Sequence, residues 1–446
     1  MGTPATLDEL AIKTIRGLSM DAVQAANSGH PGTPMALAPL GWALFSKLRR
    51  HDPAHPDWPD RDRFILSCGH ASMLQYSLLH LSGYALSLDD IRNFRQWGSL
   101  TPGHPEHHVT PGVETTTGPL GQGIGNGVGM AMAERHLAAR FNAPGHELFD
   151  HRTWVIASDG DIMEGVASEA ASIAGHLKLG KLIVFWDDNE ITIDGSTDLT
   201  FSEDVLARFS AFGWQTLSVD DGEDLVALSE AAEAAMADER PSFIRVRTTI
   251  GYPAPNKQNT SGAHGAPLGE DEVIATKQVM EWPTEHFFVP DELATAAESG
   301  RDRGAERYAD WQKRLDAYRA EHPEAAAELD AAISGELPEG RDEDLPTFDA
   351  DPKGLPTRKA SGAILNALAS KIGGLVGGSA DLAGSNNSQM KGLSNFLPDA
   401  DGVPRNVDWG IREHAMAAAI NGLALHGGVI PYGATFLVFS DYMRPS

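Results

Sequence analysis

Two acidic stretches, each following an apolar run, constrain the fold of this chain most. The apolar residues 154–157 lead into residues 158–161, and a second apolar run, 182–186, leads into residues 187–191. A helical segment lies between them, so the order is that of a β-turn-α-β unit, the building block of a parallel sheet. Because open α/β sheets bind ligands outside the carboxyl ends of their strands, both acidic turns are expected at a binding edge.

The side chains of these turns favour a hard metal ion. Asp159 and Asn189 each offer an oxygen, and with a free backbone carbonyl they suit Mg²⁺ or Ca²⁺ rather than zinc. Gly160 allows a sharp turn and lets backbone N–H groups approach an anion. The stretch therefore predicts a diphosphate site with a divalent ion. The alternative is a pair of ordinary surface turns.

Four histidines share a setting beside glycine in predicted loops: His30, His70, His104 and His264. Imidazoles suit hydroxyl and phosphate contacts and proton transfer near neutral pH. For each one alone, a histidine in a surface turn is the competing interpretation. His107 and His108 lack the glycine setting and are interpreted as solvated loop residues.

The Asp159-Gly160 turn, followed thirty residues later by Asn189, resembles the thiamine diphosphate motif. Residues 163–165 and 177–182 resemble the transketolase family, whose members usually carry Gly where Ser158 stands. The resemblance runs from about residue 7 to the last residue. It implies an α/β, parallel-sheet thiamine diphosphate-binding fold, with a complete first (diphosphate-binding) domain and an incomplete second (pyrimidine-binding) domain.

The resemblance also implies roles for residues of the first domain. Asp159, Asn189 and the Ile191 carbonyl would hold the metal, Mg²⁺ or Ca²⁺. Cofactor-binding residues would be His70, Gly118, Leu120 and Gly160, with His264 also beside the diphosphate. His30, His104 and His264 would face sugar hydroxyls, and His30 and His264 would take part in catalysis.

Residues 410–414 place the Glu413 carboxyl at a predicted helix start. The helix dipole alone favours a glutamate there. The resemblance implies instead the activating glutamate, which hydrogen-bonds the aminopyrimidine ring and so promotes loss of the thiazolium C2 proton; the cofactor is the electron sink. Glu164 would pair with Glu413 across subunits, where two close carboxyls share a proton.

The remaining residues of the second domain are assigned by the same resemblance. Phe436, Phe439 and Tyr442 would cage the aminopyrimidine, although their spacing alone is equally typical of core packing. Asp381 would contact the thiazolium side. Arg358 and Ser385 would bind the sugar phosphate, a group that an arginine fork suits.

The glycine-rich residues 114–130 precede a predicted helix that ends near Phe141. No clear strand comes before them, so they do not predict a Rossmann loop. Crowded glycines at a helix start indicate tight packing or close cofactor approach.

Composition excludes several classes of partner. The net charge of −27 argues against nucleic acid and anionic membranes, and no apolar run reaches the ~18 residues of a membrane span. The N-terminus has no signal-peptide pattern. The single Cys68 excludes a disulfide framework and indicates a cytoplasmic, packed thiol. The chain is divided into a diphosphate-binding domain (1–271), a helical connector and linker (272–356) and a partial pyrimidine-binding domain (357–446).

The implied function is that of a transketolase: reversible transfer of a two-carbon ketol group from a ketose phosphate to an aldose phosphate, through a thiamine diphosphate carbanion, in the pentose phosphate pathway. A homodimer with active sites at its interface is implied as well. The second α/β domain is short of the ~150 residues typical of a domain, so we expect the sequence to be truncated at its C-terminus relative to the family, with a separate C-terminal polypeptide as a candidate partner. The alternatives are a non-catalytic fragment or subunit of a split transketolase, and a related ketol transferase such as dihydroxyacetone synthase.

Overall fold

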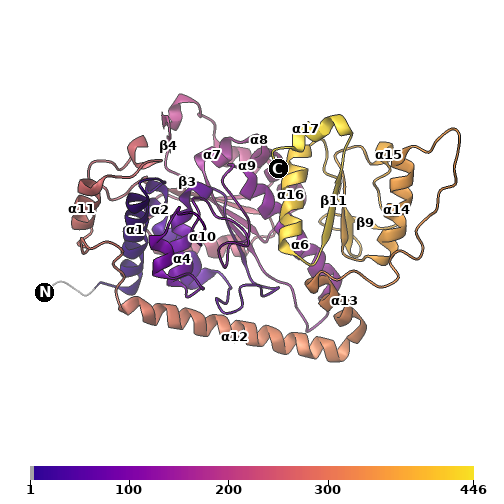
Figure 1. The fold of residues 1–446 in the computed structure, drawn as a ribbon, viewed down its shortest axis with the longest axis horizontal. Helices are drawn as coiled ribbons and strands as arrows, with labels where there is room; N and C mark the ends of the chain where they lie inside the picture. The colour runs from indigo at the N-terminus through magenta and orange to yellow at the C-terminus, as the bar shows by residue number, and fades with distance from the viewer. Residues whose placement is uncertain (1–4) are drawn as a thin grey trace. The chain divides into compact units, whose positions relative to one another are not determined.

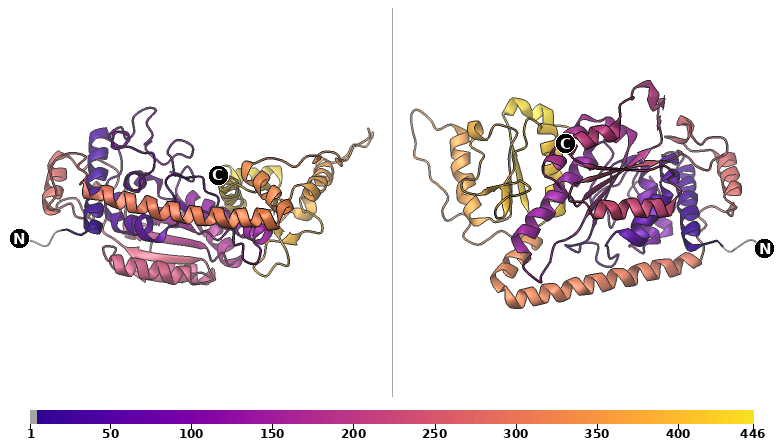
Figure 2. Two further views of the ribbon diagram at one scale, coloured as in Figure 1. Left: turned by 90° about the horizontal axis from the view of Figure 1, so that it is seen from below. Right: turned by 180° about the vertical axis from the view of Figure 1, so that it is seen from behind.

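The computed structural model describes residues 5–446, which form two compact units (Figures 1 and 2). The first unit comprises the described residues up to Ile124, Arg152–Gly165 and Gly180–Asp310. The second unit comprises Gly125–His151, Val166–Leu179 and Trp311–Ser446. Among residues 5–446, no helix is long and apolar enough to cross a membrane.

A five-stranded parallel sheet forms the centre of the first unit, in the order β1-β2-β3-β7-β6. Its strands are β1 Arg63–Leu66, β2 Thr153–Ser158, β3 Leu182–Asp188, β6 Gln215–Val219 and β7 Ser242–Arg247. Every residue of β2 and β3 is buried, as expected of strands covered on both faces, which read as continuous apolar runs. Ser158 pairs with Asp187, so the two predicted acidic stretches lie side by side.

Helices cover this sheet, and α9 and α10 pack on β6 (Figure 2). The helices of the first unit are α1 Leu7–Ala26, α2 Gly32–Ala36, α3 Ala38–Ala43, α4 Ser72–Leu81, α5 Leu88–Arg92, α7 Asp159–Met163, α9 Val205–Ala211, α10 Leu225–Met236 and α11 Glu270–Val279. Helix α1 begins with a capping box between Thr6 and Glu9 and packs against α4. A two-stranded antiparallel hairpin, β4 Ile191–Thr192 with β5 Gly195–Ser196, follows β3.

The second unit contains a four-stranded sheet in the order β11-β8-β10-β9. Its strands are β8 Leu375–Ser379, β9 Ser394–Asn395, β10 Pro404–Asn406 and β11 Ile430–Ala434. Figure 1 shows α16 (Glu413–His426) on one side of this sheet and α14 (Thr357–Lys371) on the other. The other helices of this unit are α13 Pro323–Ser334, α15 Ala383–Asn386 and α17 Ser440–Met443. Helices α6 Gln122–Phe141, α8 Gly165–His176 and α12 Glu292–Glu321 begin among residues of the first unit and continue into the second.

The glycine-rich start of α6 serves tight helix packing, as its sequence indicated. A Cβ atom at Gly125 would lie 2.5 Å from Cβ of Ala418, and one at Gly129 would overlap the backbone of α16 at Ala419. From the other side, a Cβ at Gly422 would collide with the backbone of Asn126. Residues without side chains therefore let α6 and α16 approach backbone to backbone.

Residues 436–439 are apolar beyond the end of β11 at Ala434, but the chain turns there into a 3₁₀ helix at Leu437–Phe439. One local prediction was wrong. The first acidic stretch is not an open turn, because Asp159 begins α7. A capping box between Ser158 and Asp161 starts that helix at the strand end. The expected helices after residue 271 are present as α12 and α13, and Cys68 is a buried thiol whose pKa is raised by burial.

Candidate active site

A cavity of about 520 Å³ opens at the carboxyl ends of β2 and β3 in the first unit. Ten of the residues predicted from the sequence line it: His30, His70, His104, Gly118, Leu120, Asp159, Gly160, Asn189, Ile191 and His264. Five more line it without having been predicted: Thr33, Ser158, Thr192, Ile193 and Asp194. The four histidines, the glycine turn and the acidic strand ends therefore belong to one site.

The four imidazoles come from four separate segments and meet in this cavity. The ring centroid of His30 lies 5.1 Å from that of His70, 6.2 Å from that of His104 and 5.8 Å from that of His264. The rings of His70 and His264 are stacked with centroids 5.1 Å apart. Surface turns would scatter such side chains, whereas this arrangement concentrates hydrogen-bonding nitrogens around one volume.

These imidazoles are held neutral. Burial and the nearby charge of His264 lower the pKa of His30 to about 4. Burial also lowers the pKa of His70 well below its ordinary value, and lowers those of His104 and His264. Each ring therefore offers one N–H donor and one acceptor nitrogen near pH 7.

Several of these nitrogens have no protein partner. Nδ1 of His30, Nε2 of His70 and Nδ1 of His264 are buried and make no hydrogen bond to any part of the chain that the structure describes. Buried polar atoms in proteins are almost always hydrogen-bonded, so orphaned atoms aimed at a cavity indicate a polar ligand. Hydroxyl and phosphate oxygens are matched partners for them.

The predicted metal ligand Asp159 is held by two donors. Nε1 of Trp186 donates to its Oδ1 at 2.9 Å, and the backbone N–H of Glu190 donates to its Oδ2 at 3.0 Å. Burial, followed by the charge of Asp187, raises the pKa of Asp159 to about 8. A buried carboxyl beside a second carboxyl is stabilised in its charged form by a cation.

Asn189 is oriented by its neighbours so that the site fits a hard cation. Its amide nitrogen donates to Oδ2 of Asp187 at 2.7 Å, which fixes the side of the amide that carries the oxygen. Asp187 in turn accepts a hydrogen bond from Thr248 at 2.5 Å, and burial raises its pKa to about 6. Carboxylate, amide and carbonyl oxygens are the donor set of Mg²⁺ and Ca²⁺, so the residues present fit such an ion.

Asp161 is a site residue that the sequence did not single out. Its fully buried carboxylate accepts hydrogen bonds from Ser67 Oγ at 2.6 Å, from Gly121 N at 2.7 Å and from Ser158 N at 2.8 Å. It thereby ties the loop that contains Gly118 and Leu120 to the end of β2. The capping pattern of Ser158 and Asp161 was the available signal, but the link to Gly121 is not visible in the sequence.

The remaining predicted residues do not line this cavity. Glu164 is exposed at the end of α7 and does not line the cavity. In the second unit, Glu413 is the buried first residue of α16, and Thr435 Oγ1 donates to its Oε1 at 3.1 Å. Glu413 therefore stands at the start of a helix, as predicted, where the helix dipole favours a negatively charged side chain.

Three aromatic residues beyond β11 form a row. The rings of Phe436 and Phe439 are stacked with centroids 6.1 Å apart, and those of Phe439 and Tyr442 are 6.0 Å apart. Because Phe436 and Tyr442 are exposed, core packing does not account for the row. Three further predicted residues are also exposed in this unit: Arg358, Asp381 and Ser385.

Comparison with known proteins finds family models that match two regions of the chain. Residues 7–338 match the family model described as transketolase, thiamine diphosphate binding domain, and residues 353–446 match that of the transketolase pyrimidine binding domain. The chain belongs to the transketolase family. The expected thiamine diphosphate-binding α/β fold is confirmed, and the first matched region is the family's cofactor-binding domain.

Individual relatives are similar over almost the whole chain. The transketolase of Geobacillus stearothermophilus is 56% identical over 445 residues, and that of Bacillus subtilis is 49% identical over 444 residues. Each alignment covers 99% of this chain and 66% of the relative, so the chain spans just under two thirds of their length. A Pichia stipitis transketolase in complex with sedoheptulose-7-phosphate has a TM-score of 0.96 at 44% identity, over 99% of this chain and 66% of that one.

Proposed function

We propose that the chain acts in the reversible transfer of a two-carbon ketol group between sugar phosphates, with thiamine diphosphate as cofactor. The observation that carries this proposal is the cavity in which four neutral histidines surround the acidic strand ends. Hydroxylated, phosphorylated ligands require many hydrogen-bonding groups, and three buried imidazole nitrogens of this cavity have no hydrogen-bond partner among the described residues. Relatives named transketolase support the reaction class.

Asp159, Asn189 and the Ile191 carbonyl would hold Mg²⁺ or Ca²⁺ beside the cofactor diphosphate. Three features support this role: the buried carboxyl with its raised pKa, the oriented amide oxygen, and their common position on the cavity wall. A cation there neutralises diphosphate charge that the protein, with net charge −27, would otherwise repel. Gly118, Leu120 and Gly160 would line the cofactor's path.

The cofactor, when bound, supplies a nucleophilic carbon and an electron sink for breaking the carbon–carbon bond. The protein's own part is to bind, orient and move protons. His70 and His264 would bind the diphosphate, and His30, His104 and His264 would bind sugar hydroxyls. A neutral imidazole can accept a hydroxyl proton as the adjacent bond breaks and return it later, which gives His30 and His264 their catalytic role.

Glu413 would hold a proton for the aminopyrimidine ring of the cofactor. A carboxyl that is buried at a helix start and hydrogen-bonded by Thr435 has one oxygen fixed and the other free for such a contact. Glu164 would pair with it across the interface of two subunits. The aromatic row Phe436, Phe439 and Tyr442 would enclose the pyrimidine, with Asp381 at its thiazolium side.

The exposed Arg358 and Ser385 would bind the phosphate of the sugar. Arginine presents a planar fork of N–H donors that matches phosphate oxygens, and a serine hydroxyl adds a further donor. Both side chains are exposed and therefore available to a ligand.

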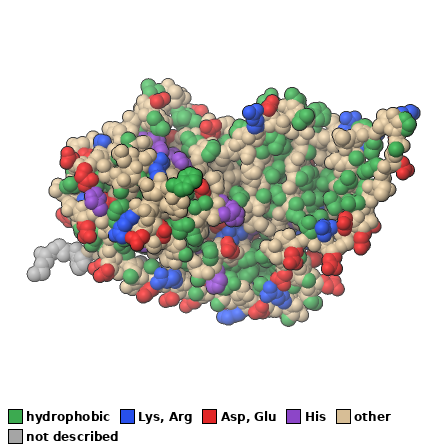
Figure 3. Space-filling model, viewed as in Figure 1, with side chains coloured by type: hydrophobic (Ala, Val, Ile, Leu, Met, Phe, Trp, Pro, Cys, Tyr) green, Lys and Arg blue, Asp and Glu red, His purple; other side chains and the backbone are tan. Residues whose placement is uncertain are grey.

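A homodimer is part of this proposal. Figure 3 shows hydrophobic side chains gathered on the face that carries α16, β11 and α17. Leu437 is 90% exposed and Val438 is 68% exposed, beside the exposed rings of Phe436 and Tyr442. Contiguous exposed apolar residues of this kind mark interaction surfaces. A second copy of the protein is the partner that would cover them, and the buried single thiol supports a reducing, cytoplasmic location.

The proposal is tested by incubating the protein with thiamine diphosphate, Mg²⁺, sedoheptulose-7-phosphate and an aldose phosphate acceptor, and following both sugars by mass spectrometry. We expect donor consumption and formation of the product longer by two carbons. His264→Ala should slow this by about 100-fold or more, the usual size of a general acid–base contribution, while the exposed His176→Ala should not. Turnover that is unchanged by His264→Ala would contradict the assignment.

A further inference from the structure

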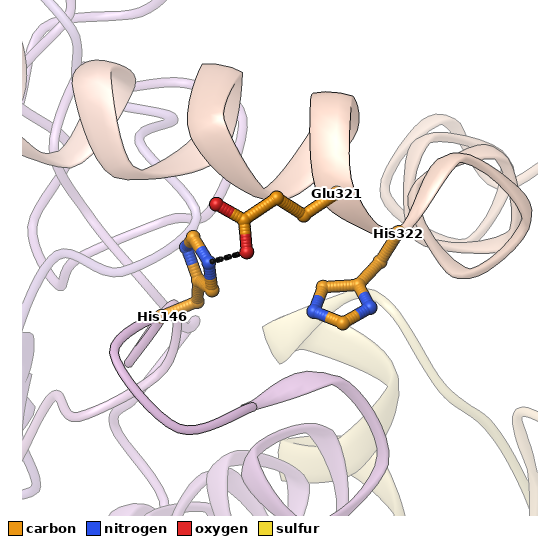
Figure 4. A group of neighbouring side chains, drawn as sticks. All are labelled: His146, Glu321 and His322. Atoms are coloured by element: carbon orange, nitrogen blue, oxygen red, sulfur yellow. Dashed lines mark hydrogen bonds and ion pairs between the residues drawn. The ribbon is translucent and has the colours of Figure 1, made fainter.

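Three potential metal ligands meet in the second unit, and none of them is among the site residues described above. They are His146, Glu321 and His322, here named the His146 cluster (Figure 4). One ligand atom from each side chain lies within 4.8 Å of the other two. Nε2 of His146 lies 3.1 Å from Oε2 of Glu321. None of the three residues lines the cavity of the first unit.

The protein brings Glu321 and His322 to the same place by breaking a helix. Glu321 is the last residue of α12 and Pro323 is the first of α13, so His322 stands between two helices. Consecutive residues of a continuous helix point about 100° apart, but proline ends α12 and changes the direction of the backbone. Figure 4 shows both side chains directed toward His146.

The position of His146 is fixed by its own loop. Ala143 and His146 exchange backbone hydrogen bonds of 3.2 and 2.8 Å, which closes a tight turn after α6. The carboxamide of Asn142 binds the backbone N–H groups of Leu148 and Phe149. Trp311 on α12 donates to the carbonyl of Leu148 at 2.8 Å, so the loop is fastened to the helix that carries Glu321.

Tyr318 holds the two imidazoles at a defined separation. Its buried ring lies 5.9 Å from that of His146 and 5.0 Å from that of His322, centroid to centroid. The two imidazoles lie edge to face, 5.8 Å apart. Nδ1 of the buried His146 makes no hydrogen bond to any described residue, so no partner on that side fixes the tautomer, and Nε2, which faces Glu321, can present its lone pair to a cation.

We propose that the His146 cluster binds Zn²⁺, with two imidazole nitrogens and one carboxylate oxygen as ligands and a water molecule in the fourth position. Two histidines and a glutamate form a donor set that zinc takes in proteins, and it is softer than the all-oxygen set at Asp159. In a tetrahedral zinc site, ligand atoms lie about 3.3–3.5 Å apart. The pair from His146 and Glu321 is close to this spacing, and Glu321, with a side chain 66% exposed, is free to adjust.

Zinc bound there would join the loop after α6 to the junction of α12 and α13. These segments are far apart in sequence. When one ion is ligated by both, the segments cannot separate unless the metal dissociates. Zinc is expected to raise the thermal midpoint of unfolding, because a ligand that binds only the folded state stabilises it. Ligation of Mg²⁺ is not expected, since imidazole is a poor ligand for it.

The test is calorimetric titration of the metal-stripped protein with Zn²⁺, in a buffer with excess Mg²⁺ to occupy the all-oxygen site at Asp159. Wild-type protein should bind one equivalent of zinc. His322→Ala and Glu321→Gln change exposed or half-buried side chains. Each should weaken zinc binding by more than about 100-fold. Removing a group that only orients a metal ligand weakens binding by about 10- to 100-fold, so a larger loss indicates a direct ligand. Co²⁺ bound in place of zinc should give the visible absorption of a four-coordinate ion.

Matched controls separate this site from general attraction of cations to an acidic protein. His176→Ala removes an exposed histidine at the end of α8, and Glu324→Gln removes an acid in the first turn of α13. Both variants should bind zinc as the wild type does. Zinc binding that is equal in wild type and His322→Ala, or absent from a folded wild type, would overturn the proposal.

Discussion

Replacing Gly129 by alanine tests the backbone-to-backbone contact between α6 and α16. A Cβ atom at this position would lie 1.9 Å from the carbonyl oxygen of Ala419 and 2.7 Å from the backbone nitrogen of Leu423. Favourable contacts between non-bonded heavy atoms are about 3.5 Å, so the two helices would have to separate by more than about 1 Å. Neither contacting atom can rotate away, because both belong to the helix backbone.

The magnitude follows from two opposing effects. Overpacking a well-packed interior costs about 1–3 kcal/mol, and a clash with backbone belongs at the upper end of that range. Alanine is favoured over glycine inside a helix by about 1 kcal/mol. The net expectation for Gly129→Ala is a loss of about 2 kcal/mol in the free energy of unfolding, or about 4–8 °C in the thermal midpoint of the second unit.

Differential scanning calorimetry measures this shift, and Gly300→Ala supplies the control. Gly300 lies in α12, where a Cβ atom would meet only the end of the Arg303 side chain, at 3.9 Å. The same substitution should stabilise the protein there by about 0.5–1 kcal/mol. A thermal midpoint that is unchanged or higher in Gly129→Ala would refute the argument that glycine is required by close approach.

Two further predictions concern buried charge and pH. Lys277 and Asp21 form a buried ion pair of 2.7 Å, so Lys277→Met should lower the free energy of unfolding by about 3–5 kcal/mol in denaturant titrations. Lys47→Met, at an exposed pair with Asp8, should change the free energy of unfolding by less than about 1 kcal/mol. Equal effects of the two substitutions would contradict the role of burial. The pKa of His30 is lowered from 6.5 to about 4, so the unfolded state binds more protons in that interval and stability should fall as pH drops from 6.5 toward 4. His30→Gln should reduce this slope relative to His176→Ala, and an unchanged slope would count against neutral burial of His30.

Long periodic or continuously apolar segments were predictable. The apolar runs 154–157 and 182–186 lie in the strands β2 and β3, and the helix predicted to end near Phe141 is α6, which ends at that residue. The buried strands β2 and β3 extend one or two residues beyond their apolar cores, since polar side chains at a strand end still pair in the ladder.

Other features depend on contacts between distant residues. The strand β11 ends at Ala434 although apolar, β-prone residues continue, and local propensity gives no sign of that end. The very short β10 pairs with the edge of β8, and β9 pairs in turn with β10. Within the site, residue types were predictable one by one, but the bond from Asp161 to Gly121 joins residues forty positions apart.

The most direct test of the central claim is calorimetric titration of the protein with thiamine diphosphate, with and without Mg²⁺. We predict binding that requires Mg²⁺ and that is lost in Asp159→Asn, which keeps the shape of the side chain but removes its charge. The exposed Asp198→Asn should bind as the wild type does. Equal binding with and without Mg²⁺, or full binding by a folded Asp159→Asn variant, would contradict the proposed metal and diphosphate site.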